Sequence, residues 1–476
     1  MISRRNLLKT AGALCAAAIA PGCASQIGQL TESRRKPNLV FVFADQWRAQ
    51  SLGYAGDVNV HTPVLDELAR HSVRFTNAVS TCPVCSPYRG SLITGQYPLT
   101  HGVFLNDVHL NNNATSIAQT FSFAGYHTAY IGKWHLNSRG RTSFIPREDR
   151  QGFDYWKVLE CTHNYNRSAY FGDENVKRFW NGYDAAAQTE DAIDYINHHA
   201  DGPPFALFLS WGPPHNPYET APAQYRAMYD PSKLVLRPNI PKNAEAGARK
   251  DLAGYYAHCS AMDACIGRLL AALKESQIDQ DTIFVFTSDH GDMLGSQGES
   301  RKQRPYDESI LVPLLIKWPK LGSREIAEPI GAPDLMPTML GLCGVAIPKT
   351  VEGNDWSAII RGQRTAHDEA ALIACYSPFG EWTRARGGRE YRGLRARRWT
   401  YVRELNGPWL LFDNETDPYQ TKNLCGQADY ASVQSELEKQ LAQKLVQTHD
   451  DFLPGADYIR KWGYVTDATG TVPYTD

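Results

Sequence analysis

The residues with the clearest chemical potential lie in the short run 85–90, which reads CSPYRG. Cys82 precedes this run and creates the spacing Cys-x-x-Cys, which occurs in zinc sites and in thioredoxin-like redox motifs. A zinc site would need a second Cys or His pair at ligand spacing, and the remaining cysteines of the sequence form none. A thioredoxin-like motif would precede a helix in a much smaller domain. Only Cys85 has proline two positions later and arginine four positions later, so we single it out as the reactive cysteine.

Polar side chains follow four apolar runs whose composition is typical of strands buried on both faces. Each run leads to its own polar group: 38–44 to Asp45 and Gln46, 282–288 to Asp289 and His290, 205–210 to His215, and 128–132 to Lys133 and His135. Helical patterns lie between the runs, the clearest at 252–273. Strands that alternate with helices predict a mostly parallel sheet with ligands beyond the carboxyl ends of its strands. We therefore expect the four polar groups to converge on one site.

Two of these polar groups have the composition of a metal site. Asp45, Gln46 and Asp289 offer hard oxygen ligands and His290 offers one imidazole, a set that suits calcium better than zinc or copper. Taken alone, an Asp-Gln or Asp-His pair after a strand can equally be a helix cap or a turn.

The run from Cys85 to Gly95 resembles the signature of type I sulfatases, Cys-x-Pro-x-Arg followed by Thr-Gly. In that family a maturation enzyme oxidises the cysteine to formylglycine, and the aldehyde hydrates to a gem-diol. One hydroxyl attacks the sulfur of a sulfate ester, and the second expels sulfate by reforming the aldehyde. The resemblance implies this conversion at Cys85, with Arg89 holding the nucleophile.

The same resemblance implies one divalent cation, expected to be calcium. Its ligands would be Asp45, Gln46, Cys85, Asp289 and His290. Sulfatases often have a second aspartate where this chain has Gln46. Asp-Gln occurs in some carbohydrate sulfatases and in the related phosphonate monoester hydrolases.

Further family motifs imply roles for cationic residues. Lys133 and Lys302 would grip the sulfate, and His135 would accept a proton beside the formylglycine. His215 would protonate the leaving oxygen, a role that matters most for a sugar alkoxide. His163 and Arg392 are candidate sugar contacts.

The resemblance extends over most of the chain and implies an alkaline-phosphatase-like α/β sandwich. The sulfatase domain would span 37–370, and a C-terminal subdomain would span 371–476 with a short antiparallel sheet and a helix near 430–447. Length agrees with this division, because 476 residues exceed the roughly 250–300 at which a single core stops growing.

The N-terminus resembles a twin-arginine export signal over 1–23, followed by a linker over 24–36. Its apolar stretch is shorter than the roughly 20 residues that span a bilayer. Residues 20–23 are close to a lipobox, so a lipid anchor at Cys23 is the alternative to ordinary cleavage nearby. These features predict an exported, periplasmic bacterial protein without a transmembrane span.

The leading hypothesis is a sulfatase acting on a sulfated carbohydrate, either a glycosaminoglycan or an algal glycan fragment. The motifs at 85–90 and 151–156 look most like those of exported bacterial glycan sulfatases. A phosphonate or phosphate ester hydrolase of the same superfamily and an inactive exported glycan-binding relative are the alternatives. A net charge of −2 argues against nucleic acid as a partner, whereas a formylglycine-generating enzyme is an expected one.

Overall fold

The computed structural model describes residues 36–365 and 370–474. Residues 36–476 form one compact unit. The expected export signal, including Cys23, lies outside the described residues, as does the expected linker apart from Lys36. Among the helices of the described ranges, none combines the length and hydropathy that crossing a membrane requires.

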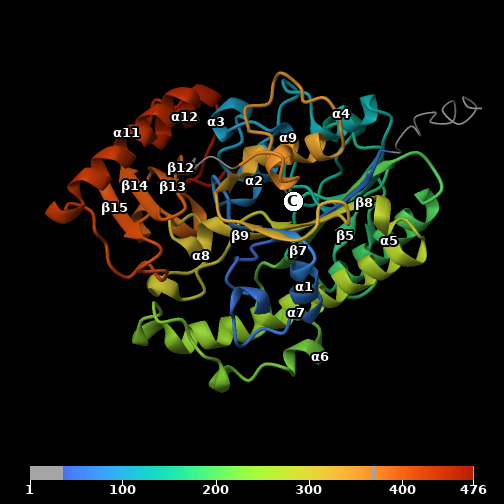
Figure 1. The fold of residues 1–476 in the computed structure, drawn as a ribbon, viewed down its shortest axis with the longest axis horizontal. Helices are drawn as coiled ribbons and strands as arrows, with labels where there is room; N and C mark the ends of the chain where they lie inside the picture. The colour runs from blue at the N-terminus through green and yellow to red at the C-terminus, as the bar shows by residue number, and fades with distance from the viewer. Residues whose placement is uncertain (1–35, 366–369, 475–476) are drawn as a thin grey trace, which may run out of the picture. The chain divides into compact units, whose positions relative to one another are not determined.

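A nine-stranded sheet forms the centre of this unit (Figure 1). Its strands are β1 (Asn38–Asp45), β2 (Val73–Val79), β3 (His127–Lys133), β4 (Tyr155–Leu159), β7 (Phe205–Pro214), β8 (Thr282–Ser288), β9 (Leu311–Lys317), β10 (Arg324–Ile326) and β11 (Ile330–Gly331). The order is β10-β2-β9-β8-β1-β7-β3-β4, and β11 pairs with β2. Only β9 runs antiparallel to its neighbours β2 and β8 among the described strands of this sheet. The predicted mostly parallel sheet is therefore confirmed.

Strand β1 shows why the sequence reads as a continuous apolar run. All eight of its residues are buried. Leu39, Phe41 and Phe43 face one hydrophobic core, while Val40 and Val42 face a second core on the opposite side of the sheet. Successive side chains of a strand point to opposite faces, so burial of both faces favours the unbroken apolar run at 39–44, between the polar end residues Asn38 and Asp45.

Helices cover both faces of the sheet. The first core contains side chains of α2 (Cys85–Thr94), α4 (Ile117–Phe123) and α9 (Ala332–Leu342). The second contains side chains of α1 (Pro63–Arg70), α5 (Asp184–His199) and α7 (Glu245–Glu275). In Figure 1 the two groups lie on opposite sides of the strands. The helical pattern at 252–273 falls within α7, which confirms the predicted helix.

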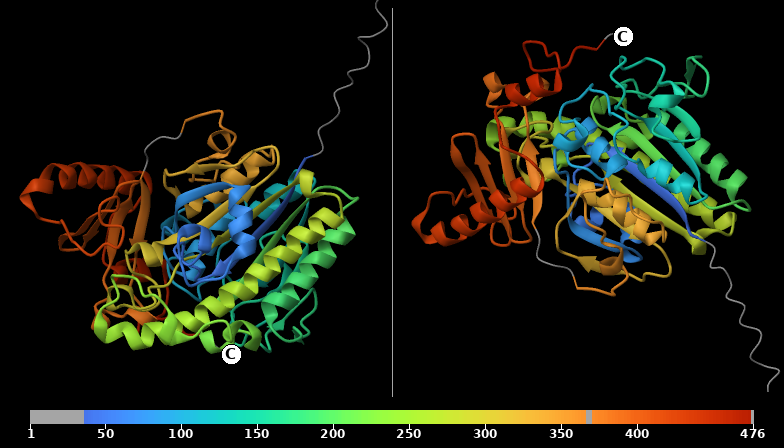
Figure 2. Two further views of the ribbon diagram at one scale, coloured as in Figure 1. Left: turned by 60° about the horizontal axis from the view of Figure 1, so that its bottom comes forward. Right: turned by 90° about the horizontal axis from the view of Figure 1, so that it is seen from above.

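A second, four-stranded antiparallel sheet follows in the C-terminal part of the chain (Figure 2). It consists of β12 (Ala371–Cys375), β13 (Tyr391–Arg395), β14 (Trp399–Glu404) and β15 (Gly407–Asp413). Leu437 and Leu441 of α11 (Ala431–Gln447) pack against it, so the expected sheet and helix are both present. The boundary between 370 and 371 stays a prediction. The shorter elements are β5 (Ala169–Tyr170), β6 (Arg178–Phe179), α3 (Pro98–His101), α6 (Ala223–Arg226), α8 (Asp307–Ile310), α10 (Ser357–Ile360) and α12 (Gly455–Trp462).

Arg392 lies inside this C-terminal part, contrary to its expected role as a substrate contact. Its side chain is 0% exposed. The guanidinium pairs with Asp450, donates to the carbonyl of Cys375 at 3.0 Å and lies 4.1 Å from the ring centre of Tyr376. A fully buried arginine with these partners stabilises the fold, so the expectation that it binds substrate is wrong.

Candidate active site

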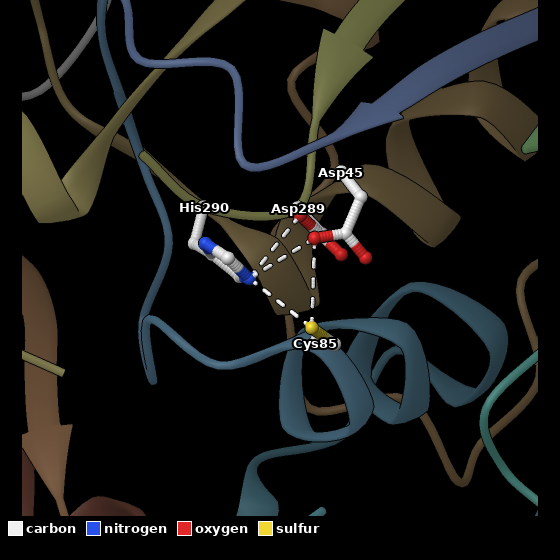
Figure 3. Close-up of side chains that lie close together, drawn as sticks. All are labelled: Asp45, Cys85, Asp289 and His290. Atoms are coloured by element: carbon white, nitrogen blue, oxygen red, sulfur yellow. Dashed lines mark hydrogen bonds and ion pairs between the residues drawn. The ribbon is translucent and has the colours of Figure 1, made fainter. Parts of the chain in front are cut away.

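The ends of β1 and β8 bring the predicted metal-binding residues together. The two strands pair in parallel with Ala44 opposite Ser288, so Asp45 and Asp289 lie at the same edge of the sheet. Possible ligand atoms of Asp45, Cys85, Asp289 and His290 all lie within 4.8 Å of one another (Figure 3). The predicted convergence of these strand ends is therefore seen in the structure.

Cys85 is the first residue of α2 and is 1% exposed. Its Sγ atom lies 3.2 Å from Nζ of Lys302, 3.3 Å from Nε2 of His290 and 3.6 Å from Nζ of Lys133. Burial and the Asp45 carboxylate raise the pKa of the Cys85 thiol. The surrounding positive charges, above all those of Lys133 and Lys302, outweigh both effects and hold the pKa well below its usual range. Sγ therefore occupies a position that favours a negatively charged group.

Cys82 has a different environment, although it is only three residues away. Burial raises the pKa of its thiol to about 12. A thiol that stays protonated is a poor nucleophile and a poor metal ligand. The two neighbouring cysteines thus differ in environment, and Cys85 is the one that lies beside lysine ammonium groups.

Arg89 lies one turn after Cys85 on α2 and binds the carboxylates of the site. Its guanidinium donates to Oδ2 of Asp289 at 3.0 Å and to Oδ2 of Asp45 at 3.2 Å. It also donates to the carbonyl of Lys133 and to Oγ of Ser210, both at 2.7 Å. We expected Arg89 to hold the nucleophile itself; the contacts seen here include the two carboxylates, which Arg89 orients beside Cys85.

The donor set fits a hard divalent cation. Burial and the neighbouring Asp45 raise the pKa of Asp289, because two carboxylates so close together repel each other. A bound cation would relieve that repulsion. Carboxylate oxygens and the amide oxygen of Gln46 are the ligand types that calcium prefers. His290 is fixed by the contact of its Nδ1 with the carbonyl of Gly291 at 2.9 Å, which leaves Nε2 facing the carboxylates.

Two lysines flank the nucleophile position. Lys133 ends β3, and its Nζ lies 2.6 Å from Oδ2 of Asp45. The preceding residue, Gly132, has a φ of +106°, and a Cβ atom there would lie 2.0 Å from the carbonyl oxygen of Ser210. Only glycine permits this close approach, which brings Lys133 to the site. Nζ of Lys302 approaches Sγ from the loop after β8. Together the two ammonium groups can bind the oxygens of an anionic ester.

His215 follows β7, which continues beyond the predicted end at Ser210 to Pro214. The backbone N–H of His215 donates to the carbonyl of Asp45 at 3.1 Å, which fixes the residue beside the metal ligands. The ring of His163 stacks on that of His215, with centroids 4.7 Å apart and planes 8° apart. His163 is exposed, so it lies where a substrate can reach it. Burial and the Lys302 ammonium hold the pKa of His215 well below its usual range.

His135 lies two residues beyond the end of β3 and pairs with a carboxylate. Its Nε2 lies 3.1 Å from Oδ1 of Asp107, which also binds Arg141. Burial lowers the pKa of His135, but the neighbouring Cys161 and Asp107 outweigh it and raise the pKa to about 10. A protonated imidazole donates rather than accepts, so the pairing with Asp107 favours a fixed cation over the expected proton acceptor.

Two acidic residues of the site were missed in the sequence. Asp107 lies in the loop after α3 and follows no strand, so no pattern marks it. Asp292 accepts a hydrogen bond from Nε2 of Gln46 at 2.6 Å. The sequence could have indicated Asp292, because it is a third polar residue in the loop that already carries Asp289 and His290.

Comparison with known proteins agrees with this geometry. The family model described as Sulfatase matches residues 37–345. The chain belongs to the sulfatase family. A second model, described as N-sulphoglucosamine sulphohydrolase, C-terminal, matches residues 295–447 of this sulfatase. These matches confirm the resemblance and show a sulfuric ester hydrolase.

Several sulfatases are similar over most of their length. The ulvan-active sulfatase of Formosa agariphila is 44% identical over 440 residues, which cover 90% of this chain and 85% of that protein. The endo-4-O-sulfatase of Bacteroides thetaiotaomicron is 29% identical, covering 85% of this chain and 91% of that one. Among solved structures, the sulfatase yidJ from Bacteroides fragilis has a TM-score of 0.80 at 31% identity, covering 90% of this chain and 99% of that chain. The predicted alkaline-phosphatase-like fold is confirmed.

Proposed function

We propose that this sulfatase hydrolyses sulfate esters of a carbohydrate, using formylglycine at position 85 and one calcium ion. The observation that carries the proposal is the position of Cys85 Sγ, which lies within 3.6 Å of both lysine ammonium groups and of an imidazole. The substrate class is supported by the names of two similar proteins, which act on ulvan or are described as an endo-4-O-sulfatase.

Formylglycine supplies a hydroxyl nucleophile where Sγ now lies. The residues around it bind the sulfate and stabilise the charge that develops during the reaction. Lys133 and Lys302 bind the sulfate oxygens and stabilise the charge that moves toward the leaving group. His135, held as a cation by Asp107, adds positive charge on the same side.

His215 is the proton donor to the leaving oxygen in this proposal. It lies beside Lys302, and its ring plane is supported by His163. A sugar alkoxide is a poor leaving group, so a positioned acid contributes most for such a substrate. His163, exposed at the same place, is our candidate contact for the sugar.

Calcium would be held by Asp45, Gln46, Asp289 and His290 together with the residue at position 85. Its chemistry there is to polarise the nucleophile and to offset the buried carboxylates. Two further expectations stay proposals: a maturation enzyme acts on Cys85, and the chain is exported to the periplasm, either free or lipid-anchored at Cys23.

The test is an assay of purified protein against sulfated sugars, an aryl sulfate and a phosphonate monoester. Mass spectrometry of the peptide that contains Cys85 accompanies it, because conversion of the thiol to an aldehyde lowers the peptide mass. We expect modified protein and the highest kcat/KM on a sulfated sugar. A fully active protein with an unmodified Cys85 thiol would contradict the proposal that formylglycine is the nucleophile. Preference for the phosphonate would favour the related hydrolases, some of which share the Asp-Gln pair.

A further inference from the structure

Gln46 contributes an uncharged group to a site that is otherwise built from charged or ionisable side chains. We propose that Asp292 is a positioning residue that turns the Gln46 amide, so that its carbonyl oxygen and not its NH₂ group faces the metal. The inference rests on the calcium site proposed above. It adds a residue that would not touch the cation but would decide whether a neighbouring ligand can bind it.

Hydrogen bonds of the Gln46 backbone fix the position from which its side chain starts. The N–H donates to Oδ1 of Asp289 at 3.0 Å, and the carbonyl accepts from the hydroxyl of Tyr255 at 2.8 Å. The residue has a φ of +72°, in the left-handed region that glutamine seldom adopts. The backbone therefore aims the side chain into the site, and only the orientation of its terminal amide remains to be decided.

The two neighbours of that amide decide its orientation. Nε2 donates to Oδ2 of Asp292 at 2.6 Å, and Oε1 accepts from Nζ of Lys302 at 3.3 Å. A carboxylate only accepts hydrogen bonds and an ammonium only donates them. Rotation of the amide by 180° would place oxygen against oxygen at Asp292 and NH₂ against the ammonium at Lys302. Both contacts would become repulsive, so one orientation is strongly preferred.

Asp292 is held rigidly enough to perform this role. It is 0% exposed. Oδ1 accepts from the backbone N–H groups of Leu294 at 3.1 Å and Arg301 at 2.9 Å, and Oδ2 also accepts from the hydroxyl of Tyr218. With Gln46 these make four donors to two oxygens, which fills the accepting capacity of a carboxylate. Asp292 contacts Nε2 of Gln46 whereas Lys302 contacts Oε1, so Asp292 would act on the metal only through the amide.

This arrangement favours an uncharged amide over a carboxylate of the same length at position 46. A carboxylate at position 46 would face Asp292 across a short, buried distance. Like charges at that separation disfavour ionisation of both groups. In this pair Asp292 carries the negative charge, and Gln46, the residue proposed to face the metal, is uncharged.

The test is a double-mutant cycle on calcium affinity, measured by isothermal titration of the chelated, full-length protein with calcium chloride. Asp292→Ala should weaken calcium binding at least tenfold in the wild-type background. In a Gln46→Ala background the same substitution should change the dissociation constant less than twofold, because no amide is left to orient. Equal weakening in both backgrounds would overturn the inference, since Asp292 would then act by charge or through the fold.

A second pair of variants covers a failure of Asp292→Ala to fold. In Asp292→Asn the two backbone N–H donors hold the asparagine oxygen, so its NH₂ group faces Gln46 and turns the glutamine oxygen away from the metal. Adding Gln46→Glu supplies an acceptor for that NH₂ group and returns an oxygen to the metal. We expect Asp292→Asn to bind calcium at least tenfold more weakly than wild type, and the double variant to recover most of the loss. No recovery by the double variant would contradict the inference.

A buried acid elsewhere provides the control. Asp263 is 3% exposed and accepts from the backbone N–H groups of Val64 and Leu65 at the start of α1. Asp263→Asn should leave calcium affinity unchanged, and loss of affinity there would show that any buried acidic substitution disturbs the site. If wild-type protein binds no calcium, the metal proposal fails together with this inference. If wild type binds and Asp292→Ala binds equally well, only this inference fails.

Discussion

Nζ of Lys302 lies 2.9 Å from Nε2 of His215, while Nδ1 of the same ring lies 2.9 Å from the carbonyl oxygen of Asn216. The carbonyl can only accept, so Nδ1 carries the proton and Nε2 offers its lone pair to the ammonium. In this state His215 is neutral and cannot donate from Nε2. Burial and the Lys302 ammonium lower the pKa of His215. An anionic sulfate that engages Lys302 would free Nε2 and offset that ammonium charge, so that Nε2 could take up a proton from solvent and then donate it to the leaving oxygen. The proton donor and the sulfate-binding group are thus coupled through one contact.

Substitutions of His215 and Lys302 should differ in how far their effect on kcat/KM depends on the leaving group. His215→Ala should lower kcat/KM for a sugar sulfate by about 10²–10⁴-fold, or about 3–5 kcal/mol, because the alkoxide then leaves without a proton. An activated aryl sulfate should lose much less, since its phenolate leaves unaided. Lys302→Ala should slow both substrates alike, because it contacts the sulfate that they share. Steady-state kinetics of both variants on both substrates is the measurement, and equal slowing by His215→Ala would assign the acid elsewhere.

Cys85→Ala should abolish turnover and leave the fold intact. The position is required for its chemistry, and the side chain that is removed is small. Cys82→Ala is the matched control, because that residue is also buried but its thiol has a pKa raised to about 12. We expect the control to keep most of its activity, with circular dichroism confirming both folds. Loss of activity in both variants would reopen the question of a redox or metal pair.

Removal of the cation should lower activity, and calcium should restore it. Asp45→Ala and Asp289→Ala should each weaken calcium binding more than Gln46→Ala, because each removes a formal charge facing the metal. Elemental analysis and titration of the three chelated variants give the ranking. Unchanged activity after exhaustive chelation, with no metal by elemental analysis, would rule out a catalytic cation.

The buried pair of Arg392 and Asp450 should contribute to stability. Asp450→Ala leaves a fully buried guanidinium without its counter-charge, which typically costs about 3–5 kcal/mol of unfolding free energy. Urea unfolding at pH 7 measures it. Glu67→Ala, which breaks an exposed pair with Arg70, is the control and should have little effect. A similar loss in both variants would contradict a special contribution from burial.

The same pair predicts a pH dependence. Burial raises the pKa of Asp450, but Arg392 outweighs it and the pKa is lowered overall. A carboxyl whose pKa is lower in the folded state stabilises the fold above its unfolded pKa, near 3.9. That stabilisation is lost as the pH falls through the lowered folded value. The difference between wild type and Asp450→Ala should therefore be full at pH 7 and shrink below about pH 4, as urea unfolding across this range would show.

Residues that a local pattern marks could be predicted from the sequence, whereas those defined by distant partners could not. Asp45 and Asp289 each follow an apolar run, and parallel strands bring such positions to one edge. Arg392 carries no local sign that its partner is Asp450, 58 residues later, so its burial was missed. The environment of His135 likewise depends on Asp107, a loop residue 28 positions earlier in the chain. Strand ends are local features, but ion pairs inside a core depend on tertiary packing.

Cys85 is 1% exposed at the buried start of α2, with the ammonium groups of Lys133 and Lys302 within 3.6 Å of its Sγ atom. If Cys85 is converted to formylglycine as proposed, the maturation enzyme would need to reach a thiol that the folded chain buries. On that proposal, maturation would precede the packing of α2 against the strands. Protein that has folded without modification would stay inactive when a maturation enzyme is added afterwards, and would become a substrate again only after unfolding. The order of events in the producing cell would thus determine what fraction of this sulfatase ever becomes active.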